Sequence, residues 1–86
     1  MNTLIISTFS CTYEEFKTDV SGFITAMGQE VVLEYEFVQA GEHKSHLLMN
    51  VLDMKALEAE MTSEAAIEWD KKNNCIDTLY AIQLVE

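Results

Sequence analysis

Two polar side chains on one predicted strand are the first candidates for chemistry. His46 and Asn50 lie four residues apart in the segment 46–52, so both point to the same face of a strand. A histidine can exchange a proton near neutral pH, and an asparagine can stabilise a developing charge. Along a strand the two are ~13 Å apart, too far for a direct hydrogen bond. They are therefore catalytic candidates only as two residues lining one cavity. The simpler interpretation, a half-solvated histidine and an asparagine that caps backbone, is favoured.

Three aromatic side chains, those of Tyr35, Trp69 and Tyr80, could stack on an aromatic ligand. Together with His46 and Asn50 they form the predicted ligand-binding set. The alternative for the aromatic residues is packing, because such side chains more often fill cores and interfaces.

The sequence shows no pattern of metal ligands. His43 and His46 are three residues apart near the start of a strand, so they point to opposite faces. The sequence contains no Cys-x-x-Cys, His-x-His or Glu-x-x-His motif. We therefore predict no metal and no cofactor.

The charge of the chain excludes several classes of partner. It has 15 acidic residues against 5 lysines, no arginine, and a formal net charge of −10. Nucleic acids and anionic membrane surfaces would repel such a chain. The lack of arginine also argues against tight binding of phosphate or carboxylate ligands. We predict no nucleic-acid partner and no membrane partner.

Cysteine content and apolar runs indicate a cytoplasmic protein. Two cysteines are too few for a secreted disulfide scaffold. No basic residue precedes the apolar stretch 4–6, so no signal peptide is expected, and no run reaches the ~20 apolar residues of a membrane span. We predict a cytoplasmic protein with reduced thiols.

Alternating apolar residues predict the strands. They fall at 3–9, 31–38, 46–52 and 76–85. In the second strand the residues expected to share one face are Val31, Leu33, Tyr35 and Phe37.

Capping signals predict the helices. Thr12 and Glu15 form a T-x-x-E capping box for a helix over 13–27, and Gly28 supplies its stop. Asp53 is a good N-cap for a short helix. Thr62 or Ser63 caps a second short helical piece, which residues 73–74 end.

The resulting order, β-α-β-β-α-β, is that of the ferredoxin-like fold. We therefore expect residues 1–86 to form one α+β domain, with an antiparallel sheet in the order 4-1-3-2 and both helical parts on one face. The strands are apolar on both faces, since Leu48 and Leu52 alternate with Leu47 and Met49. A second sheet packed on the open face would cover these side chains, so we predict a homodimer formed through the sheet.

This strand order also makes a prediction about the cysteines. The end of the first strand lies beside the start of the fourth, so Cys11 and Cys75 should be neighbours, with the histidines at the opposite end of the sheet. They could form a redox pair. The favoured alternative is two small, partly buried thiols.

Element order and pattern resemble a known superfamily. The segment 47–57, followed by a helix containing Trp69 and a strand at 78–82, resembles the dimeric α+β barrel proteins. These include antibiotic-biosynthesis-monooxygenase-like domains and small uncharacterised relatives. The resemblance implies a homodimeric barrel with a pocket between sheet and helices. Some members oxidise aromatic substrates without metal or flavin, using Asn, Trp, His or Tyr side chains.

Three functions remain open on these grounds. The first is a small homodimeric domain that binds a small hydrophobic molecule or has no catalytic activity. The second is a cofactor-free monooxygenase or isomerase acting on an aromatic, quinol-like substrate. The third is a regulatory sensor of a small molecule. The sequence leaves open whether the protein is an enzyme.

Overall fold

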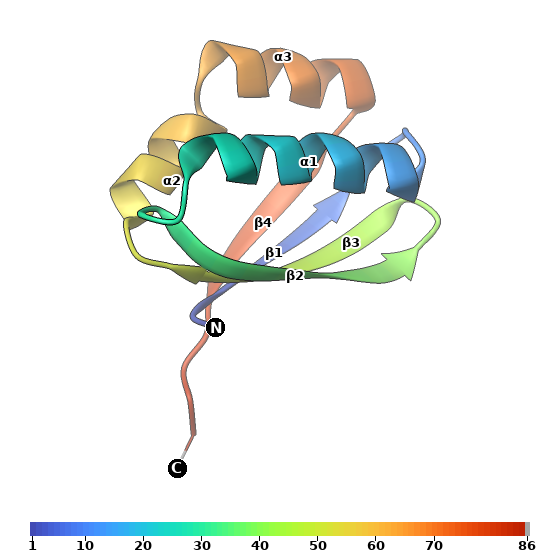
Figure 1. Ribbon diagram of the computed structural model, residues 1–86. Coiled ribbons are helices and arrows are strands. Elements are labelled where there is room, and N and C mark those ends of the chain that lie inside the picture. The colour runs from blue at the N-terminus through green and yellow to red at the C-terminus, as the bar shows by residue number, and fades with distance from the viewer. Residues whose placement is uncertain (86) are drawn as a thin grey trace.

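The computed structural model describes residues 1–85, which form an antiparallel sheet with helices on one face (Figure 1). The elements are β1 (Thr3–Thr8), α1 (Tyr13–Met27), β2 (Val32–Gly41), β3 (Lys44–Val51), α2 (Met54–Met61), α3 (Glu64–Asn73) and β4 (Ile76–Ala81). The sheet order is β2-β3-β1-β4, which is the predicted order 4-1-3-2 read from the other edge. The α+β class, the element order and the ferredoxin-like sheet are thereby confirmed.

Helix α1 begins and ends where its sequence signals predict. The Thr12 hydroxyl accepts a hydrogen bond from the Glu15 N–H at 3.1 Å, and the Glu15 carboxylate accepts one from the Thr12 hydroxyl at 2.9 Å. Gly28 ends the helix at φ 86°, a conformation that side-chain-bearing residues rarely adopt. The apolar side of α1 packs on the sheet and buries Phe16 and Ile24.

The core lies between the helices and one face of the sheet. On β1 and β3 this inner face carries Ile5, Leu47 and Met49, all almost completely buried. A second, smaller cluster forms where β1 ends and α1 begins. It consists of Phe9, Tyr13 and Phe16.

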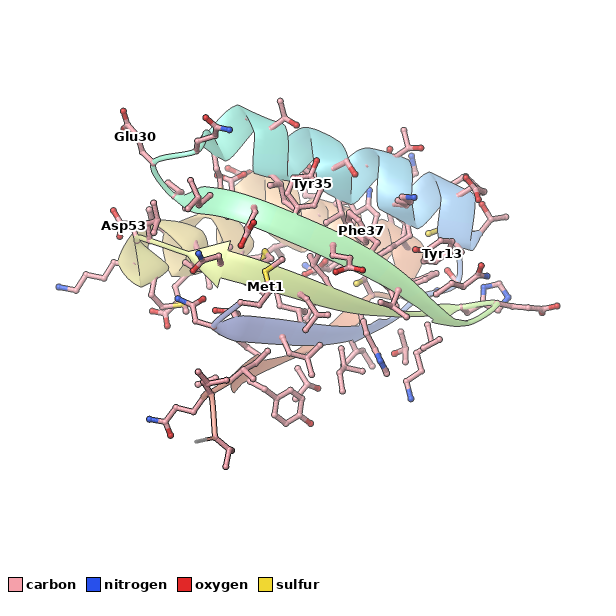
Figure 2. The ribbon with its side chains drawn as sticks, turned by 60° about the horizontal axis from the view of Figure 1, so that its bottom comes forward. Met1, Tyr13, Glu30, Tyr35, Phe37 and Asp53 are labelled. Atoms are coloured by element: carbon pink, nitrogen blue, oxygen red, sulfur yellow. The ribbon has the colours of Figure 1, made fainter. Side chains whose placement is uncertain are left out.

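Strand β2 departs from the predicted alternation. The register shifts between Val32 and Glu34, so β2 holds one residue more than β3 at this point. Val32 is therefore 3% exposed, and Tyr35 and Phe37 lie on the same inner face (Figure 2). Leu33, in the irregular step, is 47% exposed. The prediction that Leu33 shares a face with Tyr35 was wrong, because the extra residue reverses the alternation.

Strand β4 is shorter than predicted. It ends at Ala81 instead of reaching Val85. Ala81 pairs with Thr3, the first residue of β1, so β4 has no neighbouring strand beyond that point. One more hydrogen bond follows, from Ile82 N–H to the Asn2 carbonyl at 2.9 Å, and residues 83–85 then lead away from the body of the domain (Figure 1).

Helix α3 is held differently from α1. It contributes no buried residue, and Trp69 links it to α1. The Trp69 indole N–H donates to Asp19 Oδ2 at 3.0 Å, and the ring lies 6.0 Å from that of Phe16.

No helix in the described part of the chain is both long and apolar enough to cross a membrane.

Candidate functional site

A cavity of about 90 Å³ lies between the helices and the inner face of the sheet. Most of its wall is apolar and comes from β1, β3, α1 and α2. It includes Ile5, Val20, Ile24, Leu47, Met49 and Leu57. The volume is below the roughly 150 Å³ of an engineered cavity that holds benzene, so this space suits a small occupant or only part of a larger one.

Aromatic rings form a second part of the wall. Trp69 on α3 meets Phe16 and Phe23 on α1, with ring centroids 6.0 Å and 6.3 Å away. The Phe23 contact is edge-to-face, an arrangement that suits the charge distribution of aromatic rings. The predicted ligand-binding residue Trp69 therefore lines this cavity, while its N–H is already engaged by Asp19.

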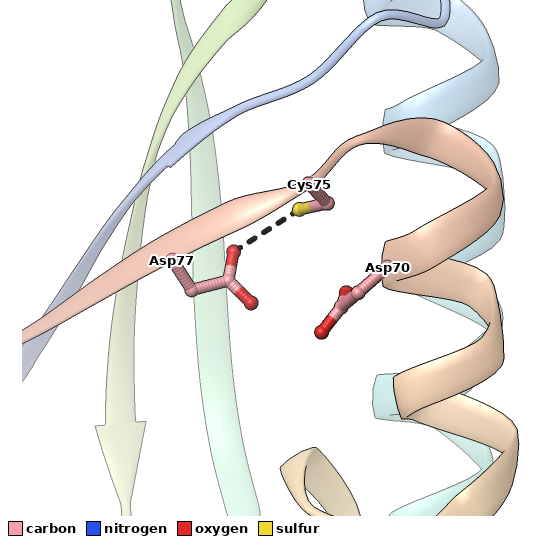
Figure 3. Close-up of side chains that lie close together, drawn as sticks. All are labelled: Asp70, Cys75 and Asp77. Atoms are coloured by element: carbon pink, nitrogen blue, oxygen red, sulfur yellow. Dashed lines mark hydrogen bonds between the residues drawn. The ribbon is translucent and has the colours of Figure 1, made fainter.

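The polar end of the cavity is formed by Asp70, Cys75 and Asp77 (Figure 3). Asp70 lies in the last turn of α3. Asn74, in a left-handed conformation at φ 49°, ends that helix, and the Cys75 N–H bonds the Asp70 carbonyl at 2.9 Å. This turn sends the chain back into β4. Asp77 then pairs with Ser7 on the inner face, so its carboxylate faces the helices.

Hydrogen bonds at this end converge on one oxygen. The Cys75 thiol donates to Asp77 Oδ1 at 3.3 Å, and the Ser7 hydroxyl donates to the same atom. One potential ligand atom each from Asp70, Cys75 and Asp77 lies within 4.8 Å of the others.

Burial and the negative charge of Asp77 perturb the pKa values of Asp70 and Cys75. Burial, reinforced by the negative charge of Asp77, raises the pKa of Asp70 above its ordinary value. Burial also raises the pKa of Cys75 far above that of a free thiol, and the charge of Asp77 and the hydrogen bond to it add to this shift. Cys75 is consequently a protonated thiol at neutral pH, not a nucleophilic thiolate.

The same three residues are the only group of potential metal ligands found in residues 1–85. A metal would need Cys75 as thiolate, and each pKa unit above the ambient pH costs about 1.4 kcal/mol. The set also lacks histidine, a common ligand of zinc. The arrangement fits a metal poorly, and the absence of a metal site stays a prediction.

The other predicted ligand-binding residues do not reach this cavity. Tyr35 is on the inner face but at the β2 edge, 39% exposed and edge-to-face with Phe37 at 5.8 Å. His46, Asn50 and Tyr80 lie on the opposite, open face of the sheet. His46 and Asn50 share a face, as expected. The His46 Nε2 is buried without a hydrogen-bond partner among residues 1–85.

The cysteines and His43 meet at one end of the sheet. Cys11 and Cys75 are both free thiols, and both pack against the cluster of Phe9, Tyr13 and Phe16. His43 Nδ1 lies 2.8 Å from the Cys11 carbonyl oxygen. The prediction that the histidines lie at the opposite end was wrong. Thr8, at the end of β1, pairs with the first residue of β3 as well as that of β4.

Comparisons with known proteins identify the architecture. No protein-family model matches the chain, and no curated protein sequence matches it. A solved structure from Pseudomonas aeruginosa matches with a TM-score of 0.57 and 14% identity, over 95% of this chain and 93% of that one. A structure described as a putative antibiotic biosynthesis monooxygenase from Deinococcus radiodurans matches with a TM-score of 0.51 and 12% identity, over 98% and 93%. A third, described as an antibiotic biosynthesis monooxygenase, gives 0.53 and 14% over the full length of both chains.

This chain shares their fold. The resemblance to the antibiotic-biosynthesis-monooxygenase-like proteins is thus confirmed at the level of architecture. At identities of 12 to 14% these matches show a shared fold alone. The activity and the ligand therefore have to be inferred from the residues of this chain.

Sequence reasoning missed the acidic end of the cavity. One signal was present: strict alternation along β4 places Asp77 on the same face as Leu79 and Ala81, which directs a carboxylate toward the helices. Asp70 and Cys75 gave no comparable signal, since their approach to Asp77 depends on the left-handed turn at Asn74.

Proposed function

We propose that the protein is a homodimer that binds a small hydrophobic molecule in the cavity between helices and sheet. The observation that carries the proposal is the cavity itself, whose walls are largely apolar and aromatic while one end is polar. Ligand sites commonly combine such a wall with a few polar groups that orient the ligand. The two free thiols fit the reducing cytoplasm, where we place the protein.

The open face of the sheet supports self-association. The register aligns Tyr80, Leu4 and Leu48 in one row across three strands, with Ile6 in the next row. Within residues 1–85, no helix lies on this side (Figure 2). A second copy would cover the row, and at ~25 cal/mol per Å² several hundred Å² of apolar surface give a gain comparable to the cost of association.

The charge of strand β2 suggests how the copies would align. Glu34 and Glu36 lie on this face along β2, so that edge would repel its equivalent. The interface is therefore centred on β1 and β3, away from β2.

Filling the cavity tests the binding proposal. Ala66 lines the cavity from α3, whereas its neighbour Ala65 is exposed. We expect Ala66→Phe to abolish binding of a neutral, apolar fluorescent probe, since the new ring would take the space of the ligand. Ala65→Phe should bind like the parent. Equal binding by both variants and the parent would show that the probe sits elsewhere, and failure of the parent to bind any neutral apolar probe would refute the proposal.

A second candidate is a cofactor-free monooxygenase or isomerase acting on an aromatic substrate. It is favoured by Asp70, a carboxyl group of raised pKa in an apolar cavity, because such groups serve as general acids and bases. A screen of anthrone-like and quinol substrates under air would detect the activity. Loss of turnover in Asp70→Asn would place it in the cavity, and loss in His46→Ala or Asn50→Ala would place it on the open face. If the parent protein shows no turnover, ligand binding is its only remaining function of the two, as it would be in a regulatory sensor.

A further inference from the structure

The charged side chains that line the helix–sheet cavity all carry the same sign. They are Glu60, Asp70 and Asp77, and no lysine, arginine or histidine lines the cavity among residues 1–85. An anionic ligand would therefore meet three like charges, while a cation would meet complementary ones.

We propose that the ligand of this cavity is a small hydrophobic amine whose ammonium group binds between Asp70 and Asp77. This inference rests on the proposed binding function and adds the chemical class of the ligand. The apolar body of the amine lies against the aromatic wall formed by Phe16, Phe23 and Trp69. Because the cavity opens at its surface, an aromatic amine can project partly from it.

The geometry of the two carboxylates fits an ammonium group. Both face the same space at the end of the cavity (Figure 3). Ser7 and Cys75 donate to Oδ1 of Asp77, which leaves Oδ2 free to accept a further hydrogen bond. An ammonium group supplies three N–H donors, enough to reach both Asp70 and Asp77 at once.

An amine fits this end better than a metal ion for a chemical reason. A metal would have to displace the proton of Cys75, whose thiol already donates to Asp77. An ammonium group leaves that hydrogen bond intact. The apolar body of the amine also contacts the apolar and aromatic walls, whereas these walls offer no ligand atoms to a metal ion.

Three ligands of matched shape and different charge test the inference. Benzylamine, benzyl alcohol and benzoate share one ring and differ in the polar group. Trp69 is the single tryptophan of the chain and lines the cavity, so its fluorescence reports occupancy. At pH 7 we expect benzylamine to bind roughly tenfold to a hundredfold more tightly than benzyl alcohol, the factor for charge-assisted hydrogen bonds, and benzoate to bind most weakly.

Matched variants assign the effect to the two carboxylates. Asp70→Asn and Asp77→Asn should each reduce the affinity for benzylamine by about tenfold and the affinity for benzyl alcohol by much less, because the alcohol carries no charge. Glu68→Gln is the control, because Glu68 is exposed on the same helix as Asp70 and does not line the cavity. It should bind all three ligands like the parent.

Each contrary outcome has a distinct meaning. Equal affinity for the amine and the alcohol overturns the amine inference and leaves the proposed hydrophobic site standing. No binding of either overturns both. An amine preference that survives in both Asp variants overturns the placement at Asp70 and Asp77. Zn²⁺ that displaces the amine and loses its affinity in Cys75→Ser overturns the inference in favour of a metal site.

Discussion

The thiol of Cys75 donates a hydrogen bond to Oδ1 of Asp77 across 3.3 Å, at the point where the chain leaves α3 and enters β4. The bond joins a group that must stay protonated to one that is normally charged. It therefore fixes the reactivity of the thiol as well as the position of the carboxylate.

The first prediction concerns that reactivity. Asp77→Asn removes a negative charge and replaces a charged hydrogen-bond acceptor with a neutral amide oxygen. The charge of Asp77 and the hydrogen bond to it both add to the effect of burial in raising the pKa of Cys75. The thiolate fraction at pH 8 should therefore increase, and iodoacetamide should alkylate Cys75 several times faster than in the parent. Mass spectrometry measures the rate. Cys11 is the internal control, since burial and then the charges of Glu15 and Asp19 raise its pKa. An unchanged ratio of the two rates would contradict the assignment.

The second prediction concerns the pH dependence of stability. The pKa of Asp70 is raised in the folded state, so folding favours its protonated form. This contribution is fully present below the pKa of an unfolded aspartate, 3.8, and is lost as pH rises through the folded pKa. Asp70→Asn should therefore be more stable than the parent at pH 7, by at most ~1 kcal/mol because Asp70 is partly solvated. The difference should vanish near pH 3.

Urea unfolding at the two pH values measures this difference. Glu68→Gln on the exposed side of α3 controls for the general loss of one negative charge. If Asp70→Asn proves less stable than the parent at pH 7, the Asp70 carboxylate makes a favourable interaction in the folded protein. The argument that burial and the charge of Asp77 disfavour this carboxylate would then be wrong.

The third prediction concerns assembly. Light scattering at micromolar concentration and physiological salt should give about twice the chain mass of 9.8 kDa. Leu48→Glu should yield a monomer, because it would place like charges against each other in a dry interface. Ile67→Glu is the matched control, since Ile67 is an exposed apolar residue on α3, remote from the open face. A parent mass of one chain, or monomers from both variants, would argue against the sheet interface.

The fourth prediction concerns the attachment of α3. Trp69→Phe keeps a ring beside Phe16 but removes the indole N–H that bonds Asp19. We expect a loss of about 1 kcal/mol in the free energy of unfolding, since a net hydrogen bond contributes roughly that much. Hydrogen exchange should quicken in α3 more than in α1. Asp19→Ala should give the same pattern, and uniform quickening along the chain would show that Trp69 supports the whole core.

The parts of the fold that local signals determine were predictable. The capping box of Thr12 and Glu15 and the stop at Gly28 act within a few residues, so the limits of α1 follow from the sequence. The sheet order follows from the order of elements. The bulge at Leu33 was not predictable, because it exists only in the pairing of β2 with β3.

The candidate site was less predictable than the fold. Trp69 was identified because an aromatic residue is conspicuous. The prediction that His46 and Asn50 share one face of the strand was correct, but the helices cover the other face of the sheet. The acidic end arises from residues on two elements that one left-handed residue, Asn74, brings together, and no pattern of side-chain types records that turn.

The position of β4 at the edge of the sheet has a consequence for colloidal stability. All six of its side chains are exposed, and its outer row of backbone N–H and carbonyl groups is a template on which another chain could add a strand. At neutral pH the net charge of −10 keeps copies apart. As pH falls toward the isoelectric point near 4.4 this repulsion fades while the edge remains. Acidification should therefore bring the protein out of solution through strand addition at β4, before the fold itself is lost.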